Sequence, residues 1–277
     1  LDEDGLPLEP GMDPATGSYS FELWRTALVN GEPRMVGVQN LLIRNQGITK
    51  YPEWGGDLAN YLFPVVIADE KTRNPQVNAK EAWGWLPPPL VGEGLKAQTG
   101  WLHDFLLEPY RIRPSVVLRM PKFNMSSDEA TKLANFFAAM DNANYPYQYD
   151  PRTHESYLAR VERERPTHLA DAMKIVVDNN YCVKCHLVGD FRPEGSPTAL
   201  APNLEDVHRR LRPEFVRNWV ANPLRKLLYT SMPVNIPYKN EPPHFGGVSQ
   251  ELYPGTSIQQ LDAVVDLLMN YNQWSRK

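Results

Sequence analysis

The stretch Cys182-Val183-Lys184-Cys185-His186 decides how the rest of the chain is interpreted. Two cysteines separated by two residues, with a histidine directly after the second, form the pattern of covalent haem c attachment. Each thiol can add to one vinyl group of the porphyrin, and the histidine then lies under the iron as its fifth ligand. The chain has only 2 cysteines in 277 residues, so none remains for a structural disulfide or a four-cysteine zinc site. The sequence therefore predicts one covalently bound haem c.

Two other interpretations of the cysteine pair stay open at this point. A thioredoxin-like redox dithiol follows a strand and opens a helix, whereas residues 169–181 have the pattern of a helix and residues 189–193, Gly-Asp-Phe-Arg-Pro, have that of a loop. A partial zinc site needs further ligands from elsewhere in the chain. The histidine directly after the second cysteine favours haem.

Composition and charge exclude several classes of protein. The net charge is -4 and the pI is about 5.9, which favours neither nucleic acid nor an anionic membrane surface as a partner. No apolar run approaches the roughly 20 residues of a membrane-spanning helix, and no signal peptide is visible. Because haem c is attached outside the cytoplasm, we expect a periplasmic or otherwise extracytoplasmic bacterial protein, present here as a mature chain or as a piece of a longer one.

The first 54 residues differ in pattern from the rest. Residues 21–25 and 35–39 are typical of short strands, and Asn30-Gly31 between them is a strong signal for a hairpin turn because both residues accept a positive φ. We predict an acidic, proline-rich tail followed by a β-hairpin appendage over residues 1–54.

Helical periodicity dominates the remainder. The expected helices cover residues 57–66, a segment from 99 to just before Pro109, a segment that starts with a cap at Ser126 or Ser127, and residues 167–180, 211–221 and 258–271. In the third of these helices the apolar residues are Leu133, Phe136, Phe137 and Met140. Residues 144–166 are polar, aromatic and charged, and are the best candidate for a linker between domains.

An internal repeat relates the two halves of the helical part. Pro88 and Pro202 lie 114 residues apart, and the same offset relates Trp101 to Phe215, Phe105 to Trp219 and Pro109 to Pro223. Met120-Pro121 and Met232-Pro233 differ by 112. The offset places Ala68, Lys71 and Thr72 where the second copy has Cys182, Cys185 and His186. The first copy therefore lacks both attachment thiols and the histidine ligand.

The second copy resembles class I cytochromes c. The resemblance rests on the order of its parts: a helix that leads into Cys182–His186, the loop Ala201-Pro202-Asn203-Leu204, a middle helix, Met232-Pro233 and a last helix. It implies a mainly α fold with two cytochrome c-like helical domains and the β-hairpin appendage. The haemless domain covers residues 55–143, the linker 144–166 and the mono-haem domain 167–277.

The resemblance also implies roles for single residues. His186 and Met232 are the expected iron ligands, and the carbonyl of Pro202 is expected to accept a hydrogen bond from the other nitrogen of His186. His244 and His208 are the rival sixth ligands. Phe215, Val216, Trp219 and Tyr229 are expected to wall the haem, and the candidates to bind its propionates are Arg209, Arg210, Arg212, Arg225 and Lys226. His103, His154 and His168 are expected at the surface.

Three functions follow from these expectations. The first is an electron-transfer protein with His/Met ligation, which belongs to a larger respiratory complex and exchanges electrons with redox proteins. The second is a haem enzyme with an open or displaceable sixth ligand, for peroxide or nitrogen-oxide chemistry. The third is a sensor or docking module in which haem staples the fold. The sequence favours the first because Met232 fills the position that a substrate would need.

Overall fold

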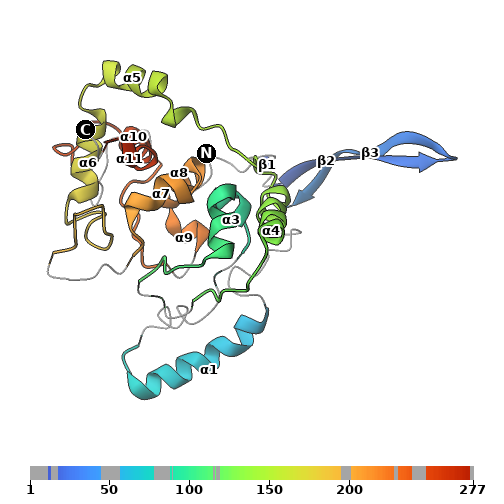
Figure 1. Ribbon diagram of the computed structural model, residues 1–277, viewed down its shortest axis with the longest axis horizontal. Coiled ribbons are helices and arrows are strands. Elements are labelled where there is room, and N and C mark those ends of the chain that lie inside the picture. Colours follow the sequence, from blue (N-terminus) through green and yellow to red (C-terminus); the bar gives the residue numbers. More distant parts are fainter. Residues whose placement is uncertain are drawn as a thin grey trace. The chain divides into compact units, whose positions relative to one another are not determined.

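The structure of the protein is a computed structural model, and it is mainly α-helical (Figure 1). It describes residues 12–13, 18–44, 57–77, 88, 90–114, 116, 119–194, 201–227, 230–238 and 248–274, without the side chains of 12–13, 18–29, 36–44 and 57–63. Backbone contacts divide the chain into two compact units, residues 1–51 and 52–277. The predicted division of the helical part at residues 144–166 stays a prediction.

The first unit contains an antiparallel hairpin. Strand β2 (Ser18–Val29) pairs with β3 (Glu32–Arg44), and the two-residue β1 (Met12–Asp13) pairs with the start of β2. Asn30 and Gly31 form the turn with φ of 54° and 83°, the left-handed conformation that a two-residue hairpin turn requires at both positions. The register shifts once between Phe21 and Leu23, as at a β-bulge.

The second unit is built from helices joined by loops. In the first helical region, which we define as residues 57–143, the helices are α1 (Asp57–Arg73), α2 (Glu93–Lys96), α3 (Thr99–Leu107) and α4 (Ser127–Met140). Residues 144–166 contain η3 (Pro151–Thr153) and α5 (Glu155–Glu164). In the second helical region, residues 168–274, the helices are α6 (His168–Val177), η4 (Leu204–Asp206), α7 (Val207–Arg210), α8 (Pro213–Ala221), α9 (Pro223–Lys226), α10 (Ser257–Met269) and α11 (Tyr271–Trp274).

Two pairs of helices follow the offset of 114 residues. Helices α2 and α7 begin and end 114 residues apart, and so do α3 and α8. Helices α4 and α10 both start with a capping box, in which Ser126 pairs with Glu129 and Thr256 pairs with Gln259. In each box the cap hydroxyl accepts from the third backbone N–H and the longer side chain accepts from the cap N–H, so two otherwise unpaired donors are satisfied.

The two helical regions join through a symmetric backbone contact. Ala97 and Leu211, which are 114 residues apart, form an antiparallel bridge. The N–H of Gln98 donates to the carbonyl of Arg210 at 2.9 Å, and the N–H of Arg212 donates to the carbonyl of Lys96 at 2.9 Å. Equivalent positions thus exchange equivalent hydrogen bonds, as at the isologous interface of a two-fold dimer.

Side chains from both regions cross this symmetric contact. The amide of Gln98 donates to the carbonyls of His208 and Leu211 at 2.7 and 2.8 Å. At the equivalent position the guanidinium of Arg212, 4% exposed, donates to the carbonyls of Ala97 and Asn144 and to the side chains of Thr99 and Gln148. This buried cation therefore stabilises the packing of the two regions through neutral oxygen acceptors.

Helices α6 and α10 pack against each other and carry a large share of the buried apolar side chains. Between them His168 is 7% exposed, its Nε2 donates to a carboxylate oxygen of Asp266 at 3.0 Å, and its Nδ1 is hydrogen-bonded to the hydroxyl of Tyr253 at 3.0 Å. The expectation that His168 lies at the surface is therefore wrong. Arg152, which precedes α5, also binds Asp266, at 2.6 Å.

Alanines form the buried face of α4. Ala130, Ala134 and Ala138 are fully or almost fully buried, whereas Phe136 and Met140 on the predicted apolar side are exposed. Gly94 of α2 explains the small side chains, because a Cβ at this position would lie 2.1 Å from the carbonyl oxygen of Phe137. Backbone thus packs directly against backbone, which large side chains would prevent.

We expect the substitution Arg212→Ala to lower the free energy of unfolding by about 3 kcal/mol, because four buried or half-buried acceptors lose a charged donor. Urea denaturation of the purified chain measures the change. Arg209→Ala is the matched control, since the Arg209 side chain is 57% exposed, and an exposed ion pair contributes less than about 1 kcal/mol. Equal effects of the two substitutions would contradict the assignment.

We expect the hydrogen bonds and ion pairs of Asp171 on α6 to be sensitive to acid. Burial disfavours the charge of Asp171, but hydrogen bonds from Lys174, Thr167 and Arg165 outweigh it and hold its pKa at about 2. The resulting stabilisation is present above the unfolded pKa near 4 and is lost as pH falls toward 2. Asp171→Asn should lower the free energy of unfolding by about 1–2 kcal/mol at neutral pH and by little near pH 2, as measured by urea denaturation at each pH. Asp190→Asn is the control, because Asp190 is exposed and its substitution should leave the free energy of unfolding unchanged at both pH values.

Candidate functional site

The cysteine–histidine stretch forms a single tight turn after α6. The N–H groups of Cys185 and His186 donate to the carbonyl of Cys182 at 3.2 and 3.0 Å, and the N–H of Val183 donates to Val176 of α6 at 3.1 Å. Both cysteines are free and half-buried. Burial raises the pKa of the Cys182 thiol to about 12, so this sulfur stays protonated near neutral pH. The turn holds the two thiols and the imidazole on one short segment.

The ring of His186 is held in one tautomer. Its Nδ1 lies 2.6 Å from the carbonyl oxygen of Pro202, and because a carbonyl only accepts hydrogen bonds, Nδ1 carries the proton. Burial lowers the pKa of His186, the bond to Pro202 opposes this change, and the charge of Arg210 lowers the pKa further. The neutral ring therefore offers the lone pair of Nε2 to a metal.

The loop that carries Pro202 is tied to the same turn. Ala201 donates its N–H to the carbonyl of Cys185 at 3.0 Å, and Leu204 donates to Leu187 at 2.9 Å. Gly189, with φ of 57°, turns the chain at the end of this segment. The hydrogen bond to His186 therefore comes from a loop that is fixed at two points.

The other predicted haem contacts are distributed over α8 and the loop after α9. Phe215 and Trp219 on α8 are half-buried and stacked, with ring centroids 5.8 Å apart. Met232 is half-buried, and its N–H donates to the hydroxyl of Thr230 at 3.2 Å. Tyr229 and His244 lie outside the described residues, so their predicted roles stay predictions, as does the ligand role of Met232.

The structure separates the basic residues that the sequence offers for haem propionates. Arg209 is paired with Asp206 at 2.6 Å, and Arg212 is occupied between the two helical regions. Arg225 is half-buried and Lys226 is exposed. Arg210 is half-buried, its Nε is buried without a hydrogen-bond partner among the described residues, and Asp206 and Glu93 act on its charge without forming an ion pair with it.

Comparison of the two regions shows why Arg210 has no such partner. Its equivalent 114 residues earlier is Lys96, whose ammonium binds Glu93 at 2.7 Å. The position equivalent to Glu93 is occupied by the buried Val207. The first region thus neutralises its own cation, whereas the second leaves a half-buried guanidinium without a carboxylate at that position. A cation with a buried, unbonded nitrogen favours an anionic ligand.

The residues equivalent to the cysteine–histidine stretch lie in a helix. Ala68, Lys71 and Thr72 belong to the last turns of α1, where Thr72 hydrogen-bonds to the carbonyl of Asp69. None of these three side chains is a thiol or an imidazole. Helix α1 also extends to Arg73, beyond the predicted end at residue 66, and its Val65 is 65% exposed.

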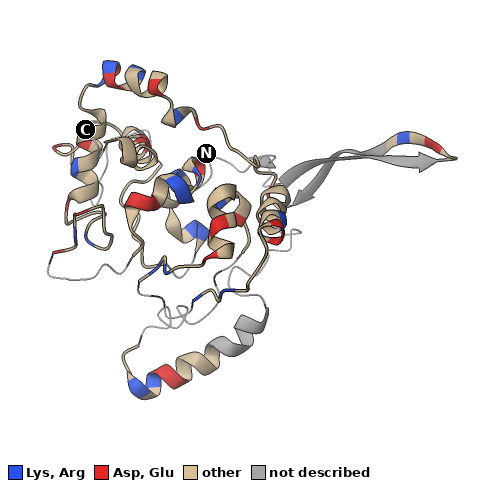
Figure 2. Ribbon diagram, viewed as in Figure 1, with Lys and Arg blue, Asp and Glu red and all other residues tan. Residues whose placement is uncertain are grey.

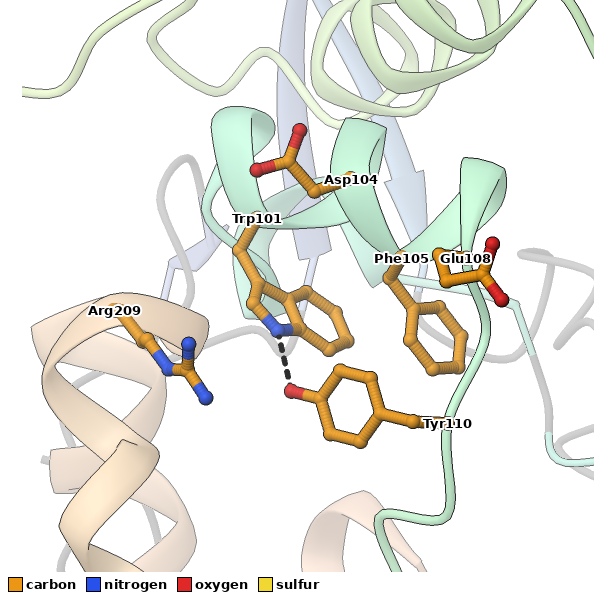
Figure 3. Close-up of a pocket in the computed structure, with 6 residues that line it drawn as sticks. All are labelled: Trp101, Asp104, Phe105, Glu108, Tyr110 and Arg209. Carbon is orange, nitrogen blue, oxygen red and sulfur yellow. Dashed lines mark hydrogen bonds between the residues drawn. The ribbon is translucent and has the colours of Figure 1, made fainter.

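Figure 3 shows a pocket of about 310 Å³ between α3 and α7 that the sequence did not reveal. Trp101 and Phe105 stack along α3 with ring centroids 4.9 Å apart, and Tyr110 meets Phe105 edge-on at 5.6 Å. Asp104, Glu108 and Arg209 complete the lining. The spacing of Trp101 and Phe105 was a visible signal, but the contact of α3 with α7 depends on residues more than 100 positions apart.

Two further observations limit what the described part of the protein can do. No group of three or more His, Cys, Asp or Glu side chains within it is arranged to hold a metal ion, so these residues do not form a complete zinc site around the two cysteines. None of its helices is long and apolar enough to cross a membrane. Lysine and arginine alternate with acidic residues along α5, and at the end of α1 an acidic segment is followed by a basic one (Figure 2).

Comparisons with known proteins assign no family to the chain. No family model matches it, and neither a curated protein nor a solved structure is significantly similar.

We expect the haem-free chain to show the His186 tautomer directly. Nitrogen-15 NMR of labelled protein should place the ring proton on Nδ1, since the Pro202 carbonyl accepts from that atom, and the imidazole should titrate below its ordinary pKa. His154 is exposed and serves as the internal reference for an unconstrained ring. A proton found on Nε2 of His186 would contradict the geometry.

Proposed function

We propose that the protein is an electron-transfer protein that carries one covalently attached haem c with His186 and Met232 as axial ligands. The observation that carries the proposal is the hydrogen bond of 2.6 Å from Nδ1 of His186 to the Pro202 carbonyl, in a turn that also holds two free thiols. Imidazole ligands in metal sites are oriented by such a bond to the second nitrogen. A redox dithiol or a structural disulfide has no need of it.

The residues present fit a haem c. Cys182 and Cys185 are the two thiols that would form thioether bonds, and Nε2 of His186 is unprotonated and therefore able to bind iron. The unpaired guanidinium of Arg210 lies near enough to His186 to lower its pKa, and it suits a carboxylate at the edge of the porphyrin. Phe215 and Trp219 would supply apolar contact.

Each residue then has a role in holding a redox centre. A bound haem c supplies an iron that alternates between Fe(III) and Fe(II). His186, fixed by Pro202, would hold the iron on one side, and the thioether of Met232 would hold it on the other and favour the reduced state. With both positions filled by side chains, no site remains for a substrate. We therefore propose electron transfer as the function.

The proposal implies a location and a class of partner. Haem c is attached outside the cytoplasm, so the protein would act in the periplasm or an equivalent compartment. Its partners would be redox proteins or subunits of a larger respiratory complex, and contacts between redox proteins are typically small and transient.

Absorption spectroscopy of protein produced with haem c maturation tests this proposal. We expect a low-spin ferric spectrum with the weak far-red band of a methionine–iron bond, and we expect Met232→Ala to abolish that band and lower the reduction potential. Met120→Ala is the matched control, because Met120 precedes a proline as Met232 does but lies in the region without cysteines. A band that persists in Met232→Ala would overturn the assignment of Met232, and so would a low-spin spectrum without the band that becomes high-spin in His244→Ala. A high-spin spectrum would instead favour an enzyme.

A further inference from the structure

Tyr110 of the first helical region is held with its hydroxyl directed into the pocket between α3 and α7 (Figure 3). Nε1 of Trp101 donates to this hydroxyl at 3.0 Å, and the edge-on contact with Phe105 fixes the ring. Tyr110 follows α3 directly, so the symmetric bridge between Ala97 and Leu211 also determines which part of the second region it meets.

The hydroxyl of Tyr110 has a proton left to donate. Indole Nε1 is a donor only, so the phenol oxygen must accept in its bond with Trp101. No other hydrogen bond of Tyr110 to a described residue is present, and the side chain is only half covered, at 45% exposed. The O–H is therefore available to an acceptor that enters from the side of α7.

The neighbouring groups favour an acceptor with negative charge. The guanidinium of Arg210 is near enough to Tyr110 and to His186 to interact electrostatically with both, and the charge of Arg113 lies close as well. The nearby carboxylates of Glu93 and Asp206 are already hydrogen-bonded to Lys96 and Arg209. The two carboxylates that line the pocket, Asp104 and Glu108, are bonded to His103 and Lys122. One O–H donor and one half-buried guanidinium, both without a hydrogen-bond acceptor among the described residues, thus lie near each other beside the proposed iron ligand.

We propose that Tyr110 and Arg210 together bind a haem propionate, so that the helical region without cysteines completes the cofactor site of the other region. This inference rests on the proposed function. The first region would then have a role at the redox centre. The Tyr110 hydroxyl and the Arg210 guanidinium would bind one propionate carboxylate and neutralise its negative charge close to the iron. Neutralising that charge favours the reduced state and raises the reduction potential.

The test is the reduction potential of the holoprotein and its Tyr110→Phe variant, which loses only the hydroxyl. We expect the equilibrium constant for reduction to fall about threefold, as a charge-assisted hydrogen bond is lost. Arg210→Gln should lower it further. Because both groups would bind the same carboxylate, the reduction potential of the double variant should fall by less than the sum of the two single decreases. Resonance Raman bands of the propionates should shift in Tyr110→Phe as well.

Tyr147→Phe is the matched control, because this tyrosine is 87% exposed and should change neither the potential nor the propionate bands. If Arg210→Gln does not accumulate as a folded protein, the Raman comparison of Tyr110→Phe with Tyr147→Phe decides. Unchanged propionate bands and an unchanged potential in Tyr110→Phe would overturn the inference while leaving the proposed function intact. Wild-type protein that acquires no haem would overturn both.

Discussion

The backbone exchange around Ala97 and Leu211 is the contact on which the rest of the helical unit depends. Two hydrogen bonds of 2.9 Å, from Gln98 to Arg210 and from Arg212 to Lys96, pair equivalent segments of the two regions. The contact sets α3 against α7 and thereby brings an aromatic surface of one region to the residues that follow the Pro202 loop of the other. A change in this register would move Tyr110 away from Arg210.

Equivalent positions on the two sides have diverged in chemistry. The first region keeps a neutralised pair, Lys96 with Glu93, and helical residues where thiols and an imidazole would be needed. The second has a half-buried Arg210, whose Nε has no hydrogen-bond partner among the described residues, and a histidine whose tautomer is fixed by a backbone carbonyl. One symmetric framework thus holds a neutralised site and a site that favours an anion, which is the arrangement expected when one member of a pair binds a charged cofactor and the other supports it.

Much of the local structure was predictable from sequence because it depends on short-range chemistry. The turn at Asn30-Gly31, the cap at Ser126 and the segment after Leu187 follow from the backbone preferences of a few adjacent residues. Helical periodicity predicted α3 and α8 within a few residues, and the offset of 114 residues relates them. Contacts between distant segments were not predictable in this way. Arg212 was expected at a propionate and instead joins the two regions, and His168 was expected at the surface and is buried against Asp266.

The central claim is that one haem is bound covalently to the stretch from Cys182 to His186. Mass spectrometry of the intact protein, produced with and without haem c maturation and followed by peptide mapping, tests it most directly. The account predicts that maturation adds the mass of one haem, carried by the peptide that contains both cysteines. An unmodified mass after maturation, or a haem bound without covalent attachment, would contradict it.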